Sequence, residues 1–329
     1  MTDSLHENLI GEELRFTHPD WGDIYVRNKR PADVTSFAPN RIVVLQHGAT
    51  YGSTAFDVPV GGLSWMDYLA ARGFDTYCLD LPGYGRSARP PQMSEPAVEN
   101  TPFMRTPDAA ECLGFICDRI RSRRDVSRVC LIGHSWGCAI TALYTSGHND
   151  LVERLVLFAP GWHRASGEQS PTHVDGPLGA YRTVNREATL KRRQAGLDDE
   201  QKKTVMPIEW FDQWWTAVIE AELGGDGETI RAPNGVVQDG REYWSAGKSV
   251  YDPALITVPV LVTVGELDRD TPVHMAQTVF PLLTGAPWRR LSVLSGGTHT
   301  ILMERHRMLL FRSVQQFLEE APPATEALA

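Results

Sequence analysis

A serine flanked by glycines stands between an apolar run and a helix-like run. Ser135 lies in LIGHSWGCA, with Gly133 and Gly137 two residues away on either side. A chain that turns from a strand into a helix within one or two residues strains its turn residue and leaves room only for minimal neighbours. Such a turn would expose the Ser135 hydroxyl at a helix N-terminus, where N–H groups and the helix dipole favour negative charge. The G-x-S-x-G pattern therefore predicts a nucleophilic serine.

Two further residues supply the base and the orienting acid that a serine nucleophile requires. His299 follows the last apolar run, in LSVLSGGTHTILM, and Asp268 follows the preceding one, in VPVLVTVGELDRD. Both would lie beyond the carboxyl ends of strands, where open α/β sheets gather their chemistry. Serine, aspartate, histidine is also the chain order of this class of hydrolase. Asp270 remains an alternative acid, whereas His47 and His134 are expected to make structural hydrogen bonds.

Acyl transfer also needs hydrogen-bond donors for the oxyanion of its tetrahedral intermediate. We expect one donor to be the backbone N–H of Trp136, directly after the nucleophile. The other is expected from Ala49, in the loop that follows RIVVLQHG, where Gly48 lets the chain approach the substrate. The signature here is HGAT rather than the HGGG of some lipases.

The elements that must position these residues can be traced along the chain. Short β-rich runs alternate with helical patterns, which predicts an α/β fold with a mainly parallel sheet. The candidate parallel strands are RIVVLQHG, FDTYCLDLPG, RVCLIGHS, RLVLFAP, PVLVTVGE and RRLSVLSGG. Two earlier runs, near residues 14–17 and 24–28, are too close together for a helical crossover and predict an antiparallel start. No convincing buried β run is found between residues 162 and 250, which predicts an insertion.

With these residues in place, the sequence resembles the α/β-hydrolase superfamily. The likeness rests on HGAT, DLPGYGRS, GHSWG, GELD and the glycine-preceded His299, in the family's order. It implies an α/β-hydrolase fold: a mostly parallel eight-stranded sheet, helices on both faces, and a mainly helical cap after the sixth strand. We therefore expect residues 1–161 and 251–329 to form the core and residues 162–250 the cap. The resemblance also assigns a structural loop to Asp80, Gly83, Gly85 and Ser87.

The resemblance excludes some reaction types known for this fold and leaves others open. Serine at position 135 argues against the epoxide hydrolases and haloalkane dehalogenases of this fold, which use aspartate, and against dienelactone hydrolases, which use cysteine. The GHSWG motif is similar to those of esterases, carbon–carbon bond hydrolases and proline iminopeptidases. A weaker likeness to bacterial monoalkyl phthalate hydrolases rests on HGATYGSTAFD, LSWMDYLAARGFD and the triad spacing.

The predicted cap is rich in aromatic residues. Five of the nine tryptophans lie in residues 162–250. Trp210 and Trp214, four residues apart in IEWFDQWW, are expected to share one face and to line an apolar or aromatic substrate pocket together with Gly48. The alternative is that these tryptophans pack a small core of the cap itself. Arg164 and Arg182 are candidate ligands for a substrate carboxylate.

The charge and residue composition of the chain argue against several classes of binding partner. The net charge of −9 and pI near 5.6 disfavour binding to nucleic acid and to anionic membranes. His163 and His173 lack acidic or cysteine partners at ligand spacing, so we expect no metal and no cofactor. No signal-peptide pattern and no run of about 18 apolar residues is found, so a cytoplasmic protein is expected. The oligomeric state is left open.

These patterns together predict a serine hydrolase that cleaves a small carboxylic ester with an apolar or aromatic group, with monoalkyl phthalate-type esters as one candidate. Ser135 would attack the carbonyl, His299 would transfer the proton and Asp268 would orient the imidazole, giving an acyl-enzyme.

Three alternatives stay open. The first is an amide or peptide hydrolase of the proline iminopeptidase type, for which Glu209, Glu220 and Glu222 are candidate ligands of the substrate amine. The second is a carbon–carbon bond hydrolase. The third is a small-ligand receptor on the same fold, without turnover.

Overall fold

The computed structural model describes residues 8–163 and 176–321. Within them, eight strands form one sheet in the order β1-β2-β4-β3-β5-β6-β9-β10. β1 (Leu9–His18) and β2 (Gly22–Pro31) are antiparallel to each other, and β2 is antiparallel to β4. All other neighbouring strands in this order pair in parallel. The strands of this parallel part are β3 (Ile42–Gln46), β4 (Asp75–Leu79), β5 (Val129–His134), β6 (Val152–Phe158), β9 (Val260–Gly265) and β10 (Arg289–Leu294). The predicted fold class, including its antiparallel start, is confirmed.

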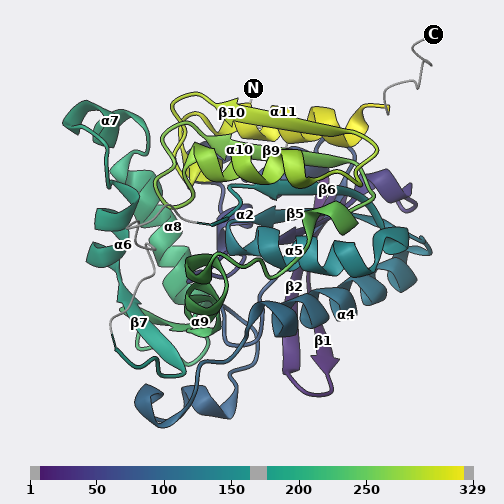
Figure 1. The fold of residues 1–329 in the computed structure, drawn as a ribbon. Helices are drawn as coiled ribbons and strands as arrows, with labels where there is room; N and C mark the ends of the chain where they lie inside the picture. Colours follow the sequence, from purple (N-terminus) through teal and green to yellow (C-terminus); the bar gives the residue numbers. More distant parts are fainter. Residues whose placement is uncertain (1–7, 164–175, 322–329) are drawn as a thin grey trace.

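Helices cover both faces of the sheet because its central strands are apolar on both faces (Figure 1). Val44 of β3 packs in the cluster formed with α4 (Thr106–Arg124), α5 (Trp136–Gly147) and α10 (Val273–Leu282). Its neighbours Val43 and Leu45 point to the other face, into the cluster formed with α3 (Trp65–Ala70) and α11 (Arg307–Glu319).

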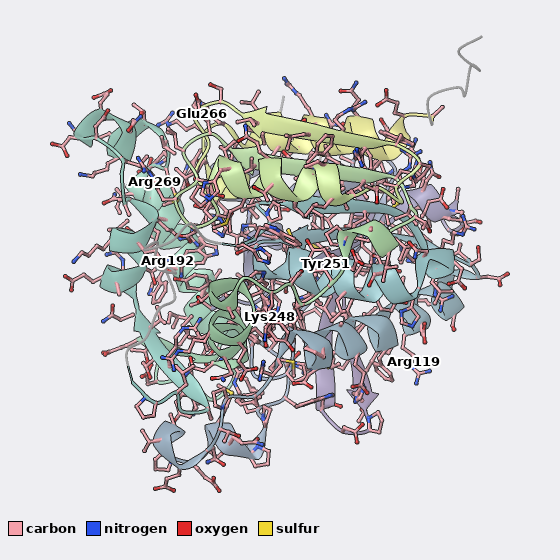
Figure 2. The ribbon with its side chains drawn as sticks, in the orientation of Figure 1. Arg119, Arg192, Lys248, Tyr251, Glu266 and Arg269 are labelled. Carbon is pink, nitrogen blue, oxygen red and sulfur yellow. The ribbon has the colours of Figure 1, made fainter. Side chains whose placement is uncertain are left out.

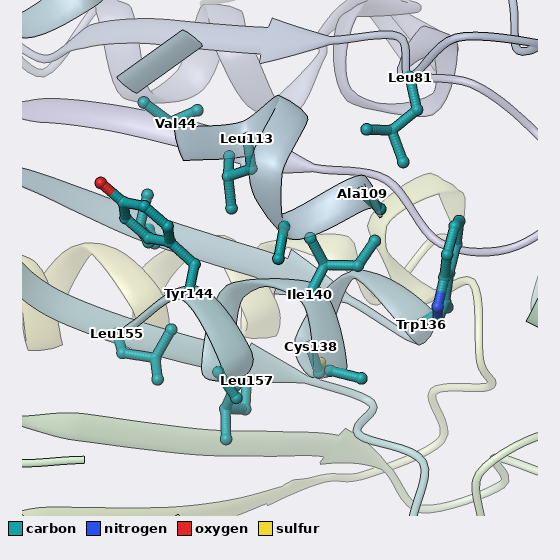
Figure 3. Close-up of a cluster of buried hydrophobic side chains, with 14 of the residues drawn as sticks. Val44, Leu81, Ala109, Leu113, Trp136, Cys138, Ile140, Tyr144, Leu155 and Leu157 are labelled. Atoms are coloured by element: carbon teal, nitrogen blue, oxygen red, sulfur yellow. The ribbon is translucent and has the colours of Figure 1, made fainter. Parts of the chain in front are cut away.

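The first of these clusters anchors the helix that carries the candidate nucleophile at its N-terminus. Figure 3 shows Leu113 of α4 and Ile140 of α5 packed with Leu155 and Leu157 of β6, and all four are fully buried. Burying each such side chain contributes about 2 kcal/mol. The start of α5 is therefore held by packing along the whole helix.

The parallel register brings the loops of interest to one edge of the sheet. Gln46 at the end of β3 lies opposite Gly133 of β5, and His134 lies opposite Phe158 at the end of β6. At the far side, Gly265 of β9 lies opposite Leu294 of β10. The segments that contain HGAT, GHSWG, GELD and His299 thus all leave the sheet at the same edge.

A long segment between β6 and β9 lies along one side of this edge (Figure 1). We call residues 162–250 the insertion. Its described part contains α6 (Arg186–Arg193), α7 (Asp199–Thr204), α8 (Ile208–Ala221) and α9 (Gly235–Glu242). It also contains an antiparallel pair, β7 (Tyr181–Asn185) and β8 (Thr229–Pro233), which the sequence did not predict because β7 is polar and half-exposed. The division of the chain into a core and a cap stays a prediction.

The insertion packs firmly onto the rest of the chain through α8. Its buried face consists of Phe211, Trp214, Trp215 and Val218, which join the same apolar cluster as α3 and α11. A four-residue helix, α2 (Thr54–Asp57), lies beneath α8. Within the described residues, no helix combines the length and the apolar composition that crossing a bilayer requires.

Trp65 tests how far the second cluster stabilises the fold. Its ring is 1% exposed, stacks on Phe311 at 5.4 Å and meets Phe158 edge-on at 6.0 Å. We expect Trp65→Ala to lower the free energy of unfolding by about 3 to 5 kcal/mol, measured by urea denaturation. Val98→Ala, at a side chain that is 88% exposed, is the control and should change it by less than about 0.5 kcal/mol. Equal losses in both variants would contradict the assignment of Trp65 to the core.

Candidate active site

Ser135 occupies a strained turn between β5 and α5. Its backbone adopts φ 58° and ψ −119°, a conformation that L-residues rarely hold. A Cβ added at Gly133 would lie 2.3 Å from the carbonyl oxygen of Gly137, and one added at Gly137 would lie 2.4 Å from that of Gln46. Both positions therefore exclude side chains, which is the physical reason for the glycines around Ser135.

Asp268 and His299 meet across the ends of β9 and β10. His299 Nδ1 donates a hydrogen bond of 2.8 Å to Asp268 Oδ2. The other carboxylate oxygen, Oδ1, accepts from the backbone N–H groups of Asp270 and Thr271, at 2.9 and 2.8 Å. Thr271 Oγ1 is the fourth donor to this carboxylate, 3.0 Å from Oδ2. The buried Asp268 carboxylate is thus fixed in place to orient the imidazole.

His134 holds the loop that carries His299. Its Nε2 lies 3.0 Å from the His299 carbonyl oxygen, and its ring stacks on Phe158 at a centroid distance of 4.6 Å. Burial, and secondarily the charge of His299, lower the pKa of His134 well below its usual value. The neutral ring therefore donates from Nε2 to the carbonyl oxygen, which is a structural role of the kind expected from the sequence.

Ser135 and His299 line the same cavity. Among the described residues, no hydrogen bond joins Ser135 Oγ to the imidazole, and Asp270 Oδ2 lies 3.9 Å from Nε2 of His299. Catalytic hydrogen bonds of an empty site commonly shorten only when substrate binds. The proton-transfer contact between Ser135 and His299 stays a prediction.

The two carboxylates near His299 control its charge. Burial disfavours the imidazolium, but the Asp268 and Asp270 carboxylates outweigh it, so the pKa of His299 is raised. Burial likewise opposes the charge of Asp270, yet His299 and Arg192 hold the pKa of that carboxyl below its usual range. Asp270 is therefore a charged neighbour of the imidazole, while Asp268 is the acid bonded to Nδ1.

The two residues predicted to form an oxyanion hole lie at the cavity beside Ser135. Ala49 and Trp136 both line the cavity at Ser135, and neither backbone N–H donates to another part of the described chain. Gly48 also lines the cavity, and a Cβ there would lie 2.9 Å from Ser135 Cβ. The HGAT loop can approach the serine only with glycine at this position.

The HGAT loop is braced by the loop that the resemblance assigns a structural role. His47 Nε2 accepts from the Leu81 N–H at 3.1 Å, which leaves Nδ1 to donate to the Gly48 carbonyl oxygen at 2.7 Å. Asp80 Oδ1 accepts from the Ser53 N–H at 2.6 Å. Burial lowers the pKa of His47, so this ring is neutral and structural.

The insertion also braces this loop. Arg182 of β7 donates from Nη2 to Thr50 Oγ1 at 2.6 Å and from Nη1 to the Pro233 carbonyl oxygen at 2.9 Å. Its donors are thus used within the protein, and Arg182 does not line the cavity. The position of Arg182 therefore favours a structural role over the candidate role as a ligand of a substrate carboxylate, which stays a prediction. The other candidate, Arg164, lies outside the described residues, as does His173.

The cavity has two arms that meet at Ser135. The first arm encloses about 660 Å³ with its opening to solvent, and the second about 600 Å³. Both arms share Ala49, Ser135, Arg192 and Asp270. Aromatic walls come from Trp136, Trp162 and Trp244 in the first arm and from Tyr51, Phe56 and Trp214 in the second.

The predicted pair of cap tryptophans is separated by the structure. Trp214 lines the second arm, but Trp210 is not among the residues that line either arm. The indole of Trp210 lies against Gly61 and under the Arg307 guanidinium, 4.5 Å from its Cζ. Trp210 lies at the margin of the buried face of α8, so spacing by four residues does not bring it to the cavity.

The sequence did not single out two charged residues of the insertion, Arg192 and Arg193. Arg192 Nη2 pairs with Asp270 Oδ2 at 2.6 Å, and Figure 2 shows Arg192 within the insertion. Arg193 lines the second arm beside His299. The run LKRRQ in a helical pattern is typical of a solvated helix face, and no signal in it distinguishes these two arginines.

Ligand atoms for a metal ion gather at one place in the described chain. His18, Asp20 and Glu111 bring one ligand atom each within 4.8 Å of the others. Asp20 and Glu111 are exposed, and none of the three lines the cavity. Exposed acids commonly gather in this way, so no metal role is assigned.

A family model described as the alpha/beta hydrolase fold matches residues 41–305. The chain belongs to the α/β-hydrolase fold family. The resemblance expected from the sequence motifs is thereby confirmed. The matched segment contains Ser135, Asp268 and His299, together with the insertion.

This α/β hydrolase has distant relatives. Protein ABHD8 of Bos taurus is 23% identical over 265 residues, which cover 80% of this chain and 54% of that protein. The chain thus spans about half the length of the curated relatives it matches. Among solved structures, the esterase EaEST from Exiguobacterium antarcticum is 17% identical, with a TM-score of 0.61 over 94% of this chain and 100% of the other. A thioesterase domain from the curacin biosynthetic pathway is 15% identical, with a TM-score of 0.59 over 92% and 99%. At these identities the structures show the shared fold.

The pH profile tests the charge relationship between Asp270 and His299. The neutral imidazole acts as the base, so its raised pKa places the acidic limb of kcat/KM above the pH expected for an ordinary histidine. Asp270→Asn removes one of the charges that raise this pKa, and we expect the limb to move to lower pH. The measurement is kcat/KM for a 4-nitrophenyl ester as a function of pH. Glu266→Gln, an exposed carboxylate that contacts Ser295, is the control (Figure 2). A limb that stays in place or moves to higher pH in Asp270→Asn would contradict the assignment.

Proposed function

We propose that this α/β hydrolase cleaves carboxylic esters with an apolar or aromatic group by way of an acyl-enzyme on Ser135. The observation that carries the proposal is the Asp268–His299 hydrogen bond, at a cavity that also holds the strained serine. The proposal is supported by two backbone N–H groups, those of Ala49 and Trp136, that have no acceptor among the described residues.

In the proposed mechanism each group has one step. Ser135 Oγ attacks the ester carbonyl carbon while its proton passes to His299 Nε2, and Asp268 stabilises the imidazolium through Nδ1. The oxyanion accepts from the Ala49 and Trp136 N–H groups, each worth about 3 kcal/mol of barrier. The alcohol leaves with the proton from Nε2. Water then attacks the acyl group by the same route, with the imidazole again acting as base.

The walls of the cavity support an apolar or aromatic substrate. Aromatic rings form part of the wall of each arm, and such rings give a large contact area with little loss of side-chain entropy. Because the arms meet at Ser135, one can receive the acyl part and the other the alcohol part. Monoalkyl phthalate-type esters, which join a compact ring to an alkyl chain, are one substrate type of this shape.

The carboxylates suited to an aminopeptidase lie elsewhere. Glu222 pairs with Arg89 at 2.9 Å, and Glu220 borders a separate polar hollow near Asp57 and Arg27. Glu209 is absent from the residues that line the two arms within the described chain. Ester hydrolysis is therefore preferred over removal of an N-terminal residue.

Ser135→Ala tests the nucleophile. We expect this variant to keep the unfolding temperature of the wild type and to lose at least about 10³-fold in kcat on 4-nitrophenyl butyrate. In the wild type, a fluorophosphonate should give one adduct on Ser135 in peptide mass spectrometry, and the variant should give none there. Ser146→Ala, in the same helix α5, is the matched control. A folded wild-type protein that neither turns over the ester nor reacts at Ser135 would favour a ligand receptor.

A comparison of leaving groups tests the preference for esters. The methyl ester and the anilide of one aromatic acid should differ by at least about tenfold in kcat/KM, with the ester favoured. An anilide that carries a free α-amine, such as alanine 4-nitroanilide, should be a poor substrate because Asp270, the carboxylate that lines both arms, is already paired with Arg192. Faster cleavage of that anilide than of the ester would overturn the proposal in favour of the iminopeptidase type.

A further inference from the structure

Arg193 is the last residue of α6, and it lines the second arm of the cavity together with Ser135 and His299. Its guanidinium makes no hydrogen bond and no ion pair with any described residue. Its Nη1 is buried without a hydrogen-bond partner. An arginine in this state is unusual, because buried donors of a charged group are nearly always satisfied.

The other two arginines near the cavity have polar partners, although Nε of Arg192 is buried without one. Arg192 is paired with Asp270 at 2.6 Å, and Arg182 donates to Thr50 and to carbonyl oxygens of β8. The charge of Asp270 is thus shared between Arg192 and His299. The second arm is left with one positive charge, that of Arg193, for which the described chain provides no counter-ion in contact.

Two aromatic rings lie against the guanidinium. Arg193 Cζ lies 3.7 Å from the ring centroid of Trp214 and 5.5 Å from that of Tyr51. Stacking of this kind fixes the plane of the group and leaves the N–H donors along its edges. Those edges match the two oxygens of a carboxylate, which an arginine binds with two parallel hydrogen bonds.

The surrounding charges favour an anion at this place. Burial lowers the pKa of Arg193 to about 10, so the group is still a cation at neutral pH. Arg192 adds a second cation next to it, while Asp270 and Glu304 are the acids that act on it from a distance. Glu304 is itself buried and accepts from Thr298, and burial raises its pKa. An anionic ligand at Arg193 would therefore be stabilised by a cation that makes no ion pair with any residue of the described chain.

We propose that Arg193 binds a carboxylate of the substrate, so that the enzyme prefers half-esters of dicarboxylic acids to neutral esters. This inference rests on the proposed ester hydrolysis at Ser135. The ligand is then an acid with one free carboxylate at Arg193 and one ester group at the serine. Its connecting part lies against Tyr51, Phe56 and Trp214, which favours a short apolar or aromatic linker.

The test compares two substrates that differ only in charge. 4-Nitrophenyl hydrogen glutarate carries a free carboxylate, and its methyl-capped counterpart does not. We expect the wild type to favour the half-ester, and Arg193→Gln to lower the ratio of the two kcat/KM values by about 10- to 100-fold. Arg193→Lys keeps the charge but not the paired donors, and it should recover part of the ratio.

Arg119→Gln is the matched control. Arg119 is also an arginine over an aromatic ring, 4.7 Å from the centroid of Phe115, but it lies on α4, away from the insertion (Figure 2). Its loss changes the net charge of the protein by the same amount and should leave the ratio unchanged. A ratio that falls equally in both variants would overturn the proposal, because a long-range effect of net charge would then explain it.

Binding provides a readout that does not depend on turnover. Ser135→Ala should bind monobenzyl glutarate in calorimetry, and the double variant Ser135→Ala, Arg193→Gln should bind it at least about tenfold more weakly. Equal affinity in the two proteins, or a wild type that favours the neutral ester, would overturn the role of Arg193 while leaving ester hydrolysis at Ser135 intact. A protein that cleaves neither ester and resists fluorophosphonate would instead contradict the proposed function, and the calorimetric comparison would still decide whether Arg193 binds the carboxylate.

Discussion

Main-chain contact between the end of β3 and the turn at Ser135 is the constraint on which the rest of the site depends. Gly137 packs on the carbonyl oxygens of Gln46 and His47, and Gly48 packs on His134 and Ser135. No side chain fits between these segments. The distance from the serine hydroxyl to the Ala49 and Trp136 N–H groups is therefore set by backbone packing, which is stiffer than any arrangement of side chains.

The sheet edge and the insertion contribute different residues to the cavity. The sheet contributes the serine, the aspartate and the histidine at the ends of β5, β9 and β10. The insertion contributes Trp214 and Trp244 to the walls, and Arg192 and Arg193 to the charge of the cavity. The Arg192–Asp270 ion pair joins the two parts next to the imidazole. Substrate shape and substrate charge are thus decided largely by the insertion, and reactivity by the sheet.

The fold was predictable because its central strands are buried on both faces. A run such as RIVVLQ can only be an interior parallel strand, and glycines two residues either side of Ser135 identify the turn. β7 was missed because a half-exposed strand of five residues has no periodic apolar signal. The side chains of the insertion were predicted poorly for a similar reason. Whether Trp210, Arg182 or Arg193 faces the cavity depends on how α6, α8 and β7 pack on the sheet, and local spacing does not encode that packing.

The hydrogen bond from Arg182 to Thr50 has a consequence for the resting enzyme. Thr50 directly follows Ala49 and holds a left-handed backbone, with φ 80°, that needs support from its surroundings. A movement of β7 away from the sheet would break the Arg182–Thr50 hydrogen bond. The backbone of Thr50, and with it the neighbouring N–H of Ala49, would then lose this support. The position of the Ala49 N–H therefore depends on the insertion as well as on the sheet edge.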